Sequence, residues 1–143
     1  MQAYLIHHAD AVGSEIDPQR PLSAHGHAQA EWLAEQVKAA GFAPPVIWHS
    51  GKLRARQTAE IVWRHCSPFA EFKAVHGLQP TDTPDEMARE LVHSATDVLV
   101  VGHMPHIAAL LSILDPDSAP FPLHGLVALE FDRNAWVERW RLR

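Results

Sequence analysis

The stretch Tyr4-Leu5-Ile6-His7-His8-Ala9-Asp10 joins a short apolar run to two histidines and an acid. An apolar run that stops abruptly at polar residues is typical of a buried strand in an α/β protein. Ligands of such proteins bind beyond the carboxyl ends of the parallel strands. His7, His8 and Asp10 are therefore the first candidate site residues, and other strands that end in polar residues would supply their partners.

Apolar runs and turn residues further along the chain predict alternating strands and helices. Strands are expected at 2–6, 46–48, 71–75 and 97–101, and a turn at 132–134 should join strands at 125–131 and 136–142. Helices are expected at 24–40, 53–65 and 105–114, and a further helix opens at 83–86. This order predicts a three-layer α/β/α sandwich with a mostly parallel sheet, the final hairpin being an antiparallel edge element.

Helix ends carry recognisable signals. Ser23 is expected to cap the helix at 24–40, and Gly41 is expected to end it. Thr83 and Glu86 have the spacing of a capping box, with Pro84 at the first helical position.

Periodicity predicts which side chains enter the core. Trp136 and Trp140 are an even number of residues apart, so they should share one face of the last strand. In the helix at 24–40 the expected apolar positions are Ala28, Trp32, Leu33, Val37 and Ala40.

The composition predicts one globular domain covering residues 1–143, without a lid insertion. Hydrophobic residues make up 47% of the chain and charged residues 20%, which suits one sizeable core. The formal net charge of −5 argues against a general nucleic-acid binder. With one cysteine, Cys66, no signal peptide and no apolar run near ~20 residues, we expect a cytoplasmic protein without a membrane partner.

Three of the predicted strands end in residues suited to catalysis. They end at His8, at Ser50 and at His103, and parallel strands would bring these ends to one edge of the sheet. Arg54 follows in the first turn of a helix, where free backbone N–H groups and a forked guanidinium bind anions. Histidines and an arginine around a helix N-terminus predict a phosphate pocket.

Four segments resemble motifs of the histidine phosphatase superfamily, which has the phosphoglycerate-mutase-like fold. Residues 5–10 are similar to its arginine-histidine-glycine motif, and 17–30 to the segment that follows in its SixA-type phosphohistidine phosphatase branch. Residues 50–59 are similar to the serine-proline-leucine…arginine-alanine…threonine-alanine motif, and 101–105 to the glycine-histidine-x-proline motif. The matches follow one another in the family's order.

The resemblance implies a role for each matching residue. His8 would be the nucleophile that accepts the phosphoryl group, Arg54 would bind the phosphate, and His103 would stabilise the transferring group. Ser50 would belong to the phosphate-binding residues. No cofactor and no metal are implied, and the substrate would be a phosphorylated protein or a small phosphate ester.

Two residues depart from the family pattern. His7 stands where the family has arginine, and an imidazole is charged only when a neighbour such as phosphate raises its pKa. The protein could therefore be slow, work best at mildly acidic pH, use Arg20 as the replacement, or bind phosphate without turnover. Gly51 stands in place of a proline, an exchange that should be tolerated.

A general acid is not evident from the sequence. The mutase-like branch places a carboxylate after the third strand, whereas residues 77–80 read Gly-Leu-Gln-Pro here. A phosphohistidine needs such an acid less than an alkyl phosphate does, because imidazole leaves readily. This difference favours protein phosphohistidine as substrate, and Asp10 is the alternative proton donor nearest in sequence.

Two competing functions stay open at this stage. In a metal-dependent hydrolase, the ligands could be His7, His8, Asp10 and His103. Adjacent histidines on a strand should point to opposite faces, which disfavours joint ligation. A module that binds phosphorylated proteins without catalysis is the other alternative, motivated by His7.

Overall fold

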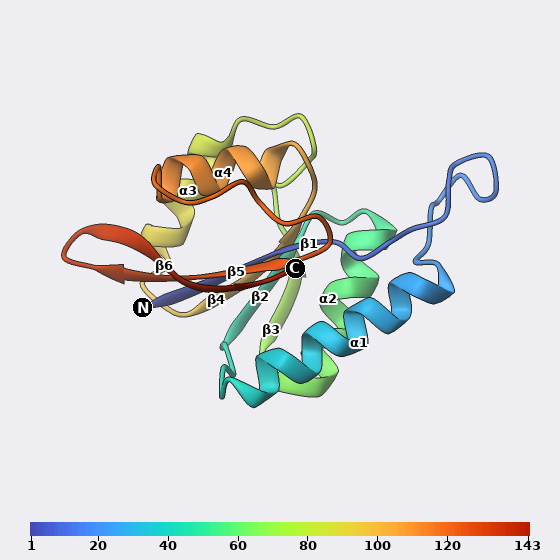
Figure 1. The fold of residues 1–143 in the computed structure, drawn as a ribbon, viewed down its shortest axis with the longest axis horizontal. Coiled ribbons are helices and arrows are strands. Elements are labelled where there is room, and N and C mark those ends of the chain that lie inside the picture. Colours follow the sequence, from blue (N-terminus) through green and yellow to red (C-terminus); the bar gives the residue numbers. More distant parts are fainter.

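The computed structural model describes residues 1–143, which form one six-stranded sheet with helices on both faces (Figure 1). The strands lie in the order β3-β2-β4-β1-β5-β6. Neighbours among β1 (Gln2–His7), β2 (Val46–His49), β3 (Glu71–Ala74) and β4 (Val98–Gly102) are parallel. The strands β5 (Leu126–Asp132) and β6 (Ala135–Leu142) form an antiparallel hairpin. In this hairpin β5 pairs antiparallel with β1, and β6 forms one edge of the sheet. The predicted architecture is confirmed.

The four helices form the two outer layers (Figure 1). They are α1 (Ala24–Ala39), α2 (Leu53–Cys66), α3 (Pro84–His93) and α4 (His106–Leu114). Side chains of β1 alternate between the layers: Leu5 joins the core under α3 and α4, whereas Tyr4 and Ile6 join the core over α1 and α2. Each fully buried side chain of this size contributes about 1.5–3 kcal/mol. None of the helices is both long and apolar enough to cross a bilayer.

The ends of α1 agree with prediction, but the capping box of α3 does not form. The Ser23 hydroxyl accepts a hydrogen bond from the Gly26 N–H, and Gly41 takes the left-handed φ of 74° just beyond α1. Thr83 makes no side-chain cap, and the Glu86 carboxylate lies beside Gly77 instead of turning back to the Thr83 N–H.

The predicted apolar face of α1 is partly wrong. Trp32 is 43% exposed, and Ala28 and Ala40 are also exposed. The helix packs against α2 and the sheet, and it meets them through a stripe of mostly small residues. Those buried residues are Gly26, Ala30, Leu33, Ala34 and Val37. A bulky indole does not fit such a close helix–helix contact, so Trp32 lies outside it.

A β-bulge separates the two tryptophans that were expected to share a face. Ala128 pairs with Trp140 but Leu129 pairs with Glu138, so one residue of β6 is left without a partner. Trp136 therefore enters the α3/α4 core, whereas Trp140 lies edge-on to Tyr4 on the other face. The turn is also shorter than predicted, because Asp132 belongs to β5 and only two residues of positive φ connect the strands.

One close approach fixes where α1 begins relative to β1. A Cβ atom built on Gly26 would lie 1.9 Å from the backbone oxygen of Asp10. The same oxygen accepts the Ser23 N–H at 3.0 Å, so the start of α1 is held directly against the segment that follows β1.

We expect Gly26→Ala to destabilise the protein. Helix propensity alone would make this change stabilising by about 1 kcal/mol. The clash with the Asp10 carbonyl should reverse the sign and lower the free energy of unfolding by about 1–3 kcal/mol. Urea denaturation of the two proteins measures it, and a stabilised variant would show that the contact at Gly26 relaxes without penalty.

Candidate active site

Parallel pairing brings three strand ends together. His7 lies opposite Gly102 in the β1–β4 register, and His49 lies opposite Val101 in the β2–β4 register. The following residues, His8, Ser50 and His103, therefore gather at one edge of the sheet and are all buried. The rings of His8 and His103 are 5.0 Å apart. The convergence predicted for these strand ends is confirmed.

The imidazole of His8 is held in one neutral form. Its Nδ1 lies 2.7 Å from the carbonyl oxygen of Ala9, so Nδ1 carries the proton and donates it while Nε2 keeps a free lone pair. Burial lowers the pKa of His8 to about 4, although the hydrogen bond to Ala9 opposes this and the Arg54 charge adds to it. The N–H of Ala9 donates to the buried Thr58 hydroxyl, which anchors this segment to α2. At neutral pH, Nε2 of His8 is an available nucleophile.

His7 is also neutral, and its proton is on the other nitrogen. The backbone N–H of His124 donates to His7 Nδ1 at 2.8 Å, so the ring proton lies on Nε2. Burial lowers the pKa of His7 to about 3, and the neighbouring His8, His124 and Arg54 add to the effect. A charged His7 beside a phosphate is thus disfavoured, because protonation of Nδ1 would break the bond to His124. In this state His7 offers one neutral N–H donor.

The expectation that the adjacent histidines point apart is wrong. His8 lies just beyond the end of β1, and the rings of His7 and His8 are 4.5 Å apart. With His124 they form a cluster in which the potential ligand nitrogens lie within 4.8 Å of one another. His7 fits a metal site poorly, because its Nδ1 is engaged and its Nε2 carries a proton.

Arg54 is a cation without an anionic partner. It occupies the second position of α2, its Nε is buried without a hydrogen-bond partner, and it makes no ion pair. Burial lowers its pKa, and the charge of Arg20 lowers it further. Arg20 donates from Nε to the carbonyl of Val12, and its charge also reaches His8. Two arginines near neutral imidazoles make this edge of the sheet favourable for an anion.

Ser50 and His103 form a hydrogen-bonded pair beside His8. The Ser50 hydroxyl lies 2.6 Å from His103 Nε2, and burial lowers the pKa of His103 to about 3. If the hydroxyl donates to Nε2, the proton of His103 lies on Nδ1, which is buried without a partner. The amide of Gln79 donates to the Ser50 carbonyl at 2.7 Å. A neutral side chain therefore lies after the third strand, where the mutase-like branch has a carboxylate.

His124 is the site residue that the sequence did not indicate. It lies in the loop before β5 with a φ of 51°, and its ring stacks on His7 at 4.7 Å. Its Nδ1 donates to the carbonyl of His8 at 2.6 Å, and its Nε2 lies 3.9 Å from Asp10 Oδ1. Asp10 reaches the site through this contact. His124 reaches the site because it precedes β5, which pairs with β1. That pairing belongs to the folded topology and cannot be read from the sequence around His124.

His49 and Gly51 have structural functions in the β2–α2 turn. The Gly51 N–H donates to His49 Nδ1, and Gly51 has a φ of 92°. Proline is limited to a φ near −65°, so this turn excludes the proline of the family motif. The glycine is therefore required by the conformation of this turn.

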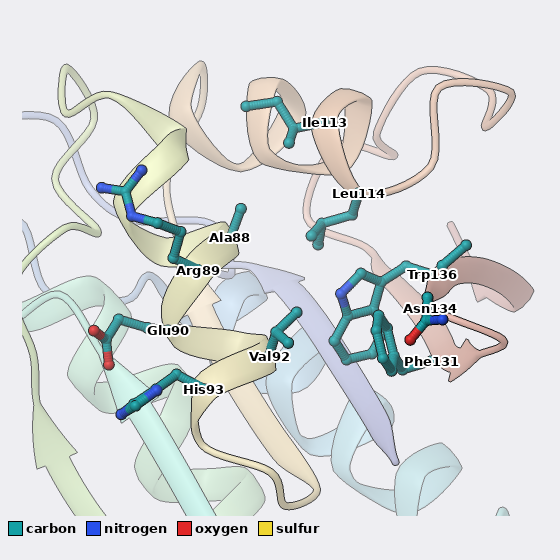
Figure 2. A pocket seen from close by; sticks show the side chains of 11 residues that line it. Ala88, Arg89, Glu90, Val92, His93, Ile113, Leu114, Phe131, Asn134 and Trp136 are labelled. Atoms are coloured by element: carbon teal, nitrogen blue, oxygen red, sulfur yellow. The ribbon is translucent and has the colours of Figure 1, made fainter.

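A cavity of about 890 Å³ lies away from these residues (Figure 2). It is formed by α3, the C-terminal end of α4 and the β5–β6 hairpin, with Leu114 and Trp136 among its lining residues. The histidine cluster lies at the opposite end of α4, where His106 begins the helix. The cavity and the anion site are separate features.

Comparisons with known proteins agree with this geometry. A family model for the histidine phosphatase superfamily (branch 1) matches residues 6–84. The structure of the protein histidine phosphatase SixA complexed with tungstate is similar over 99% of this chain and 96% of that one, with a TM-score of 0.86 and 24% identity. A protein from Agrobacterium tumefaciens assigned as a phosphohistidine phosphatase SixA has a TM-score of 0.82 and 25% identity, over 99% and 97% of the two chains.

More distant structures share the same fold. A phosphoserine phosphatase variant from Entamoeba histolytica in complex with phosphoserine has a TM-score of 0.75 and 14% identity, with 98% and 95% of the chains covered. No curated protein matches the sequence. The predicted phosphoglycerate-mutase-like architecture is confirmed by these likenesses.

The buried histidines predict a loss of stability in mild acid. His7, His8 and His103 have folded-state pKa values of about 3, 4 and 3, against an ordinary value of 6.5. Below that ordinary value the unfolded chain binds more protons than the folded chain, so their contribution to stability is complete above it and is lost as the pH falls towards the folded-state values.

Urea denaturation between about pH 7 and about pH 5 should therefore show a falling free energy of unfolding, and His103→Gln should reduce the slope. His27→Gln, at an exposed position in α1, is the matched control and should keep the slope of the original protein. A slope that is unchanged in His103→Gln would contradict the burial argument.

Proposed function

Because the chain belongs to the histidine phosphatase superfamily, we propose that it is a phosphatase that forms a covalent phosphohistidine on His8 and acts on protein phosphohistidine. The observation that carries this proposal is the half-buried Arg54, whose Nε is inaccessible and unpaired, which has no carboxylate partner and whose charge reaches the neutral His8. A cation without a counterion in a partly buried site favours the binding of an anion, and membership of this family supports phosphate as that anion.

The geometry supports a division of tasks between the residues. Nε2 of His8 attacks phosphorus, and its Nδ1 proton stays on the bond to Ala9. Arg54 binds equatorial oxygens of the transferring group, with Arg20 adding positive charge. His7 donates from Nε2 and His103 from Nδ1. Phosphoryl transfer requires mainly such positioning and stabilisation of charge. Water then attacks the phosphohistidine and releases phosphate.

The solved structures that this chain resembles favour a phosphorylated protein as substrate. The SixA structures are the more similar, with TM-scores of 0.86 and 0.82 against 0.75 for the phosphoserine phosphatase, which leaves a phosphate ester as the second candidate substrate.

The two competing functions receive less support. Metal-dependent hydrolysis would require His7 to give up its Nε2 proton or its bond to His124. A binding-only function was motivated by the missing arginine, but His7 still supplies a donor and Arg20 supplies charge to His8.

We expect labelled phosphate to be trapped on His8 during turnover of a phosphohistidine protein. His8→Ala should abolish both trapping and turnover, because it removes the nucleophile. Arg54→Gln should lower kcat/KM by ~10²–10³, by analogy with the loss of other charge-stabilising donors.

Arg56→Gln is the matched control, since Arg56 is an exposed arginine on the same helix and should be dispensable. Full activity in His8→Ala would contradict the covalent mechanism. Activity lost on chelation and restored by a divalent cation would support the metal-dependent alternative instead.

A further inference from the structure

We propose that His124, held by the His8 carbonyl and by stacking on His7 with the Asp10 carboxylate near its Nε2, is the general acid that protonates the leaving group, and that the site therefore also hydrolyses oxygen esters. This inference rests on the proposed function, because it supplies the proton for transfer to His8. It also replaces the argument that the lack of an acid after the third strand restricts the site to N–P bonds.

The orientation of His124 leaves one nitrogen free for chemistry. Its Nδ1 is occupied by the bond to the His8 carbonyl, and its ring is fixed by stacking parallel to His7, with 7° between the ring planes. Backbone pairing holds the same loop, because the His7 N–H donates to the Gly125 carbonyl at 3.1 Å. Nε2 is the remaining nitrogen, and it is directed to the side where Asp10 lies.

The depth of each residue places His124 beside the leaving group. His7, His8 and His103 are almost completely buried, and the proposed function places the phosphate against them. In-line transfer puts the leaving group opposite His8 Nε2, facing the open side of the site. The side chains of His124 and Asp10 are 19% and 44% exposed, so this pair lies at the rim through which the leaving group must depart.

One anionic and two neutral groups lie around His124. His7 and His8 are neutral neighbours, and the Asp10 carboxylate is the anionic one. Asp10 Oδ2 accepts a hydrogen bond from the Ser23 hydroxyl at 2.6 Å, which holds the carboxylate in place. A bound phosphate dianion would add a second negative charge beside His124.

The proton then moves in a closed cycle. As His8 Nε2 bonds to phosphorus, the P–O bond to the leaving group breaks and that oxygen takes the proton from His124 Nε2. In the second step, water bonds to phosphorus, the N–P bond breaks, and the proton of water passes to His124 Nε2. His8 regains its lone pair, inorganic phosphate leaves, and the net reaction is hydrolysis.

His124→Asn separates acid catalysis from positioning. Asparagine accepts the positive φ at this position, and its amide can replace the Nδ1 donor to the His8 carbonyl, but it cannot transfer a proton. The probes are phenyl phosphate, which has a poor leaving group, and p-nitrophenyl phosphate and phosphoimidazole, which have good ones. Asp10→Asn is the second variant and tests the contribution of the negative charge near His124 Nε2 without changing the loop.

We expect His124→Asn to lower kcat/KM for phenyl phosphate by ~10²-fold or more and for the other two probes by less than about tenfold. Asp10→Asn should also lower kcat/KM most for phenyl phosphate, with smaller losses than those of His124→Asn. An equal loss for all three probes, or no loss for phenyl phosphate, would overturn the inference while the phosphoenzyme on His8 still forms. Failure of the original protein to form that phosphoenzyme would overturn the proposed function, and the inference with it.

Discussion

The parallel register of β1, β4 and β2 is the constraint on which the site depends. Hydrogen bonding between these strands places His7 opposite Gly102 and His49 opposite Val101, so the residues after each strand meet at one edge. A shift of one residue in either register would turn every side chain of the shifted strand to the other face of the sheet. The alternate packing of Tyr4, Leu5 and Ile6 into the two cores prevents such a shift.

The convergence of strand ends also sets the electrostatics of the site. The histidines of the cluster are buried by the same packing that brings them together, and burial is the largest cause of the lowered pKa of His7, His8 and His103. The resulting pocket holds neutral imidazoles, while positive charge is left to the arginines. This distribution of charge suits the phosphate that the proposed function places there.

Predictions that depended on short-range patterns were largely confirmed. The strand and helix order, the Ser23 cap and the meeting of His8, Ser50 and His103 follow from periodicity, capping chemistry and the position of strand ends. Predictions failed where a contact distant in sequence determines the local structure. The Glu86 carboxylate lies beside Gly77 instead of closing a capping box, and the bulge in β6 places Trp136 and Trp140 on opposite faces.

The sequence by itself determined the fold class, the family and the candidate nucleophile, because apolar periodicity and motif order are written in consecutive residues. The chemical state of the site was decided by tertiary structure. His124 is far from His7 along the chain, yet its backbone N–H determines which nitrogen of His7 carries the proton, and its ring lies between His7 and Asp10. Only the pairing of β1 with β5 brings that loop to the site, since hydrogen bonds between distant segments depend on the folded topology.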